Sequence, residues 1–171
     1  MNIVLIGYRG AGKSSVGRRL ATQQGKLFVD TDAIVQERAG RSIRQIFEDQ
    51  GERVFREHEA RAVQAACMHE NAVISVGGGA VMNPDNAARL KSAGRIVWLR
   101  ATAEVLWQRI SGDEASGPQR PRLTPKGGLT EVVHKLAERE PVYESLADHV
   151  VNTSRATVED VVRQIIEGLE A

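Results

Sequence analysis

The sequence predicts an α/β protein in which a central parallel sheet of five strands lies between two layers of helices. Short apolar runs alternate along the chain with segments of helical periodicity, a pattern typical of parallel strands joined by crossover helices. The first apolar run leads directly into a glycine-rich segment at residues 7–14 and then into a helical pattern. The length of 171 residues fits one core, so we expect a single domain over residues 1–171.

Five apolar runs are the predicted strands, and helical patterns fill the intervals between them. The strands cover Asn2–Ile6, Lys26–Val29, Ala72–Val76, Arg95–Leu99 and His149–Val151. The predicted helices cover Lys13–Gln24, Ala33–Ala39, Ile43–Gln50, Glu52–Glu70, 84–93, Ala103–Ile110, Thr130–Leu146 and Val158–Leu169.

Most of these helices carry a start or stop signal of their own. Ser42 with Gln45 has the spacing of a capping box, and Asn83 precedes a proline at the first helical position. Further N-caps are Thr102 and Thr157, and the terminating glycines are Gly25 and Gly94. Pro141 lies inside a helical pattern, where we expect a kink or a break.

Composition excludes several classes of function. Lys and Arg number 23 against 22 Asp and Glu, which gives no global attraction to nucleic acid or to anionic membranes. The single cysteine, Cys67, cannot form an internal disulfide or supply a thiolate zinc cluster. The first residues show no basic region followed by a long apolar stretch, so we expect no secretory leader, and no apolar run has membrane-spanning length. We therefore expect a cytoplasmic protein, and a monomer, with no nucleic acid or membrane partner.

Residues 7–14 read G-x-x-x-x-G-K-S between a strand and a helix, which is the phosphate-binding P-loop pattern. The glycines allow successive backbone N–H groups to point at an anion, and the helix dipole adds positive potential there. In this pattern Lys13 reaches the β- and γ-phosphates, and the Ser14 hydroxyl binds Mg²⁺. The sequence predicts an ATP site in a P-loop NTPase fold, formed by Gly10, Ala11, Gly12, Lys13, Ser14 and Ser15.

Two aspartates, Asp30 and Asp32, directly follow the second predicted strand. Ligands of doubly wound sheets bind beyond the carboxyl ends of the strands, and residues two apart in an extended segment point the same way. One carboxylate could therefore act through Mg²⁺ and its waters while the other accepts a hydroxyl of the acceptor. The alternative is an Asx-turn and N-cap pair that only starts the helix over Ala33–Ala39.

Further candidates are three arginines, a triple glycine and a segment without periodicity. Arg56, Arg120 and Arg139 could bind anions, although each could also be a solvated surface charge. Gly77–Gly79 suggests close approach of a ligand to the main chain. Residues 111–128 hold four glycines and three prolines, which predicts a mobile lid over the phosphates or, alternatively, a loop without function.

The ordered set of motifs resembles the shikimate kinase family over essentially the whole chain. Its members are the P-loop, Asp30 and Asp32, Gly51-Glu52 with Phe55-Arg56 and Glu59, Gly77–Gly79, Arg120-Pro121-Arg122-Leu123, and Arg139 with Tyr143. The resemblance implies a three-layer P-loop fold and ATP-dependent phosphorylation of the 3-hydroxyl of shikimate, with Mg²⁺ as cofactor. That reaction is a step toward chorismate and the aromatic amino acids.

The resemblance also implies roles for individual residues. Arg56 and Arg139 would hold the shikimate carboxylate, and Asp32 would accept the hydroxyl. The remaining implied contacts are the backbone of Gly78 and Gly79 to shikimate, Ser14 and Asp30 to Mg²⁺, Lys13 and Arg120 to the transferred phosphoryl group, and Arg109 and Arg155 around adenine. Three alternatives stay open: a gluconate kinase on the same fold, a nucleoside monophosphate kinase, and a regulatory module that binds ATP without turnover.

Overall fold

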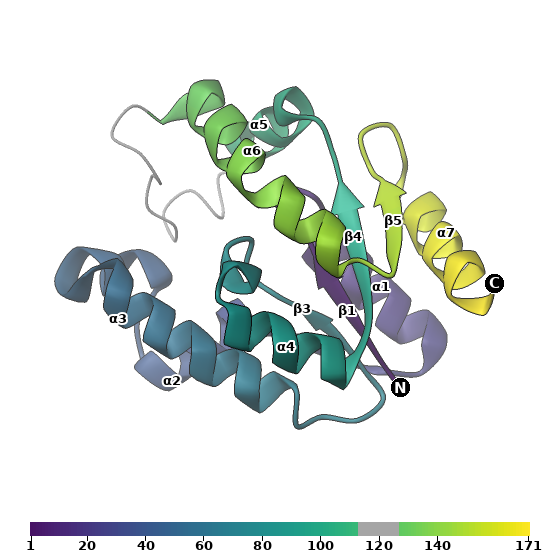
Figure 1. Ribbon diagram of the computed structural model, residues 1–171, viewed down its shortest axis with the longest axis horizontal. Coiled ribbons are helices and arrows are strands. Elements are labelled where there is room, and N and C mark those ends of the chain that lie inside the picture. The colour runs from purple at the N-terminus through teal and green to yellow at the C-terminus, as the bar shows by residue number, and fades with distance from the viewer. Residues whose placement is uncertain (113–126) are drawn as a thin grey trace.

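The computed structural model of the chain describes residues 1–112 and 127–171. Its five strands form one parallel sheet in the order β2-β3-β1-β4-β5 (Figure 1). The strands are β1 (Asn2–Ile6), β2 (Leu27–Asp30), β3 (Ala72–Ser75), β4 (Gly94–Arg100) and β5 (His149–Asn152). The predicted fold class and all five strands are confirmed, and no strand boundary differs from its prediction by more than one residue.

Helices cover both faces of the sheet. They are α1 (Lys13–Gln24), α2 (Thr31–Ala39), α3 (Ile43–Ala66), a short 3₁₀ helix η1 (Ala80–Met82), α4 (Pro84–Ala93), α5 (Ala103–Gly112), α6 (Gly128–Leu146) and α7 (Val158–Glu170). In Figure 1, α4 and α6 lie on the near side of the sheet and α1 lies on the far side. Among the described residues, no helix combines the length and apolar character needed to cross a bilayer.

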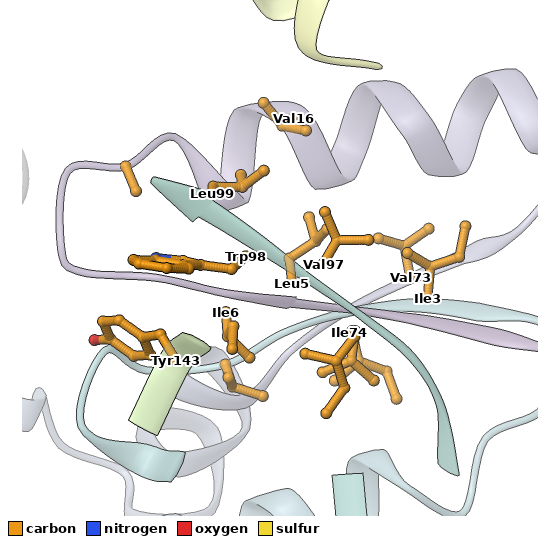
Figure 2. Packing of buried hydrophobic residues seen from close by; sticks show 14 of the residues in the cluster. Ile3, Leu5, Ile6, Val16, Val73, Ile74, Val97, Trp98, Leu99 and Tyr143 are labelled. Carbon is orange, nitrogen blue, oxygen red and sulfur yellow. The ribbon is translucent and has the colours of Figure 1, made fainter. Parts of the chain in front are cut away.

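The core lies on both sides of the central strand β1, all five residues of which are buried. Because helices cover both faces, β1 is a continuous apolar run and not an alternating one. Figure 2 shows Leu5 and Val97 on the side of Val16 from α1, and Ile6 on the opposite side with Tyr143 from α6. Two layers of side chains thus fix both helices against the strand that leads into residues 7–14.

The interruption expected at Gly51 is present, whereas three other local expectations differ from the structure. The helical patterns predicted on either side of Gly51 form α3, which is kinked at Gly51, where the backbone is not helical and φ is 84°. That helix ends at Ala66, before its predicted end at Glu70, and the chain passes through Asn71, with φ of 56°, before it enters β3. Pro141 does not break α6, which continues to Leu146. The helix after β2 begins at Thr31, so Asp32 is helical and not in an extended segment.

Parallel pairing places the residues that follow the strands at one edge of the sheet. Leu5 of β1 pairs with Ser75 of β3, and Val29 of β2 pairs with Ile74. The chain leaving β1, the chain leaving β2 and the chain leaving β3 therefore emerge side by side. The glycine-rich loop, the two aspartates and the triple glycine are brought together in this way.

Candidate active site

The segment at residues 7–14 forms a tight loop between the end of β1 and the start of α1. Gly10 has φ of 86° and Gly12, the N-cap of α1, has φ of 95°, a conformation that glycine adopts without steric cost. The Ala11 N–H donates to the Tyr8 carbonyl at 3.1 Å and closes the turn. The loop thus presents the N-terminus of a twelve-residue helix, whose free N–H groups and dipole favour phosphate.

A cavity lies beside this loop. Its lining includes Gly10, Gly12, Lys13, Ser14, Ser15, Asp30, Asp32 and Arg109. Lys13 Nζ donates to the carbonyl oxygens of Gly7 and Tyr8, at 2.6 and 3.1 Å. Most residues predicted to hold ATP therefore surround one cavity, and the ammonium group of Lys13 is held against the loop backbone.

Asp30 caps the helix that follows it, and its second carboxylate oxygen contacts the phosphate loop. Its Oδ1 accepts from the Asp32 N–H at 2.9 Å, which caps α2. Its Oδ2 accepts from the Ser14 hydroxyl at 3.4 Å. A hydroxyl and a carboxylate oxygen side by side at a phosphate loop are ligands that Mg²⁺ prefers, with phosphates completing its coordination. The pair therefore fits the predicted metal site.

A second pocket adjoins the phosphate cavity. Its lining residues are Arg9, Asp32, Ile43, Phe47, Phe55, Arg56, Glu59, Gly77, Gly78, Gly79 and Arg139. Arg9, Asp32 and Ile43 line both spaces, so the second pocket meets the phosphate cavity at the Asp32 carboxylate. A molecule in this pocket would have an apolar wall, three arginines and two carboxylates around it, and one of these carboxylates, Asp32, also lines the phosphate cavity.

The guanidinium groups of Arg56 and Arg139 converge over Gly79. A Cβ added at Gly79 would lie 2.8 and 2.9 Å from the terminal nitrogens of Arg56 and 3.1 Å from Nη2 of Arg139. Arg56 comes from α3 and Arg139 from α6, two helices far apart in the sequence (Figure 1). Two planar cations at one point form a fork that suits a carboxylate.

Glu59 orients Arg56, a function that sequence reasoning did not assign to it. Its Oε1 accepts from Arg56 Nη1 at 2.7 Å, and the side chain is 3% exposed. Burial raises the pKa of Glu59 above its ordinary value, and the neighbouring Arg56 opposes that rise. The available signal was the spacing of three residues on one helix, which places both side chains on the same face.

The spacing between Arg139 and Tyr143 has a structural explanation. The Tyr143 hydroxyl donates to the Gly78 carbonyl at 2.5 Å. The Tyr143 ring packs against Trp98 of β4, with 5.6 Å between the ring centroids. Burial raises the pKa of Tyr143 well above its usual range, so the phenol stays protonated. Tyr143 thereby fixes α6 to the triple glycine one turn from Arg139, which is itself buried.

Arg109 of α5 joins the phosphate loop to the turn that follows β5. Its Nη1 donates to the Gly10 carbonyl at 3.2 Å, and its Nη2 donates to the Thr153 carbonyl at 2.6 Å. The Thr153 hydroxyl donates in turn to the Ala11 carbonyl at 3.3 Å. Arg155 is exposed in the same turn. Of the two residues predicted around adenine, Arg109 therefore lines the phosphate cavity, and Arg155 lies in the turn that Arg109 contacts through Thr153.

One predicted catalytic residue falls outside the described part of the chain. Arg120 belongs to residues 113–126, as does most of the lid predicted at 111–128. Conversely, Arg9 lines both cavities although sequence reasoning did not select it. Its place between the glycines of the phosphate loop was the available signal.

A kinase must hold its acceptor in a defined place beside ATP, and the second pocket provides such a place. The fold and this cationic pocket together define a P-loop kinase of a small anionic molecule. The family model described as shikimate kinase matches residues 9–170. The chain belongs to the shikimate kinase family.

Individual relatives agree with this assignment. Shikimate kinases of Syntrophus aciditrophicus and Symbiobacterium thermophilum are 39% and 41% identical, covering 99% of this chain and 91% and 97% of those proteins. The solved shikimate kinase from Acinetobacter baumannii in complex with shikimate has a TM-score of 0.92 at 31% identity, covering 99% of this chain and 92% of that one. A gluconokinase from Sinorhizobium meliloti, at TM-score 0.62 and 19% identity, shares the fold alone.

Proposed function

We propose that this enzyme transfers the γ-phosphoryl group of ATP to the 3-hydroxyl of shikimate, giving ADP and shikimate 3-phosphate. The observation that carries this proposal is the pair of guanidinium groups over Gly79, in a pocket that opens onto the phosphate cavity at Asp32. Shikimate has a carboxylate at one end of its ring and hydroxyls at the other. A carboxylate held by Arg56 and Arg139 would direct the hydroxyls toward Asp32.

The geometry supports a division of labour at the transferred group. Asp32 accepts the proton of the attacking hydroxyl as the oxygen forms its bond to phosphorus and the bond to ADP breaks. Lys13 leaves its two carbonyl partners to follow the γ-phosphoryl group, where it neutralises developing charge. The P-loop N–H groups hold the phosphates in line for the transfer. Gly78 and Gly79 provide the backbone surface on which the acceptor rests.

Mg²⁺ is the cofactor that this site would hold, through Ser14 and Asp30. Their hydroxyl and carboxylate oxygens, which lie 3.4 Å apart, suit a hard cation. When bound, Mg²⁺ neutralises charge on the phosphate oxygens of ATP. We also propose that the protein acts as a cytoplasmic monomer, because residues of one chain line both cavities and ATP is a cytoplasmic substrate.

The test is an acceptor panel with purified protein, ATP and Mg²⁺, followed by coupled detection of ADP. Shikimate should support rapid ADP release, and mass spectrometry should identify a singly phosphorylated product. Gluconate and nucleoside monophosphates serve as matched acceptors for the alternative functions. Faster turnover with gluconate than with shikimate would contradict the proposal, and ATP binding without turnover on any acceptor would favour a regulatory module.

A further inference from the structure

Tyr8 is a buried aromatic residue inside the phosphate loop, at a position where the G-x-x-x-x-G-K-S pattern specifies no residue type. Its side chain is 2% exposed. The Cζ atom of Arg139 lies 5.3 Å from the centroid of the Tyr8 ring. This distance is within the range of an attractive interaction between a guanidinium group and an aromatic face. The nucleotide loop therefore contacts one of the two arginines of the acceptor pocket.

Arg139 needs such support because an arginine has several rotatable bonds, whereas a carboxylate fork requires one orientation of its plane. The same guanidinium group lies against the triple glycine, with Nη1 at 3.2 Å from a Cβ added at Gly78. The Tyr8 ring and the glycine backbone thus both limit where the guanidinium plane can lie. Arg56 has a comparable support in the carboxylate of Glu59.

The Tyr8 ring is itself fixed by the loop that carries it. The Tyr8 carbonyl accepts from the Ala11 N–H and from Lys13 Nζ, each at 3.1 Å. The loop backbone also packs against Gly78, since a Cβ added there would lie 3.3 Å from the Arg9 nitrogen. The ring and the carbonyl of one residue therefore contact an arginine of the acceptor pocket and the phosphate-binding lysine.

We propose that Tyr8 is a positioning residue, whose ring holds the Arg139 guanidinium in the plane that binds the acceptor carboxylate. This inference rests on the proposed function, in which Arg139 binds that carboxylate. Tyr8 touches no reacting atom and acts through Arg139. Its identity tunes affinity for the acceptor from within the loop that binds the donor.

The test replaces the ring and measures acceptor and donor parameters separately. Tyr8→Leu should raise the KM for shikimate about 5- to 30-fold, the range given by a partly desolvated cation–π contact, while kcat changes less than about 3-fold. Tyr8→Phe keeps the aromatic face and should restore most of the acceptor affinity. Phe28→Leu is the matched control, because the Phe28 ring makes a similar contact outside the acceptor pocket. The Cζ atom of Arg18 lies 4.7 Å from the centroid of the Phe28 ring. That control should leave the KM for shikimate unchanged.

A double-mutant cycle shows whether Tyr8 acts through Arg139. On an Arg139→Met background, Tyr8→Leu should add less than about 2-fold to the KM for shikimate, because coupled residues are not additive. Full additivity, or equal losses in Tyr8→Phe and Tyr8→Leu, would overturn the inference. If Tyr8→Leu does not fold, Tyr8→Met fills the same space without a ring and answers the same question. A wild-type enzyme inactive with shikimate would instead refute the proposed function.

Discussion

Replacing Gly79 with alanine tests the convergence of Arg56 and Arg139 with one methyl group. The Gly79 backbone has φ of −98° and ψ of −1°, which alanine adopts without strain. The added Cβ would nevertheless lie 2.8 Å from one terminal nitrogen of Arg56, and 3.1 Å from Nη2 of Arg139. Since ordinary van der Waals contact begins at 3.4 Å, both guanidinium groups must move.

The size of that movement sets the expected loss of shikimate affinity. The Arg56 guanidinium must retreat by about half an ångström, and a misplacement of about 1 Å in a positioning group costs about 100-fold. We therefore expect the KM for shikimate to rise about 10-fold, with a smaller fall in kcat. The atoms that move are the ends of flexible side chains, so the free energy of unfolding should change by less than about 1 kcal/mol.

The assay combines shikimate titration by calorimetry in the absence of ATP with a separate titration of a non-hydrolysable ATP analogue. Gly112→Ala is the matched control, because no atom of residues 1–112 or 127–171 lies within 4 Å of a Cβ added at that end of α5. This control should leave shikimate affinity unchanged. A normal shikimate affinity in Gly79→Ala would show that the acceptor does not use these two guanidinium groups. An equal loss of ATP affinity would show that the effect is not confined to the acceptor pocket.

Three further substitutions test other parts of the site. Lys13→Ala should lower kcat at least about 100-fold with the fold intact, because the charge that follows the γ-phosphoryl group is lost; near-normal turnover would refute the phosphate-loop assignment. Asp32→Asn should lower kcat about 10²- to 10⁴-fold, while shikimate affinity measured by calorimetry changes little. A normal kcat would show that Asp32 has only a structural role in the helix. Burial raises the pKa of Glu59 above its ordinary value of 4.5. The raised pKa therefore contributes to the free energy of unfolding below pH 4.5, and this contribution is lost as pH rises through the raised pKa. The wild type should therefore lose unfolding free energy relative to Glu59→Gln as pH rises above 4.5 in urea titrations, and a difference independent of pH would contradict this.

The fold was predictable because its signals are local. Capping boxes at Ser42 and Thr157 start α3 and α7 where the sequence placed them. Pro141 does not break α6, because its local effect competes with tertiary packing. Arg139 and Tyr143 are both buried on α6, on either side of the proline, and this packing holds the helix continuous. A helix with a buried face on both sides of a proline tolerates the lost hydrogen bond.

The candidate site was predictable where a motif carries its own geometry, as at Lys13 and Ser14. It was not predictable where function depends on contacts between distant segments. In the sequence, little distinguishes Glu59 from other glutamates on helices. Its importance comes from its partner Arg56, which lies beside Arg139 only because α6 packs there. Thr153 gains its contact with Arg109 only when α5 packs near the turn after β5. For Glu59 the sequence offers only the three-residue spacing from Arg56, and for Thr153 it offers no signal beyond polarity.

The triple glycine has a structural reason that the sequence did not suggest. The sequence suggested that a ligand needs close approach to this backbone, yet each glycine first accommodates part of the protein. A Cβ at Gly77 would lie 2.9 Å from Glu59 Oε2 and 3.0 Å from Asp32 Oδ1. One at Gly78 would lie 3.3 Å from the Arg9 nitrogen. The glycines are therefore required because two carboxylates, the phosphate loop and two guanidinium groups converge on one stretch of backbone. That convergence, set by parallel pairing of β1 and β3, is what brings the acceptor pocket up against the phosphate loop.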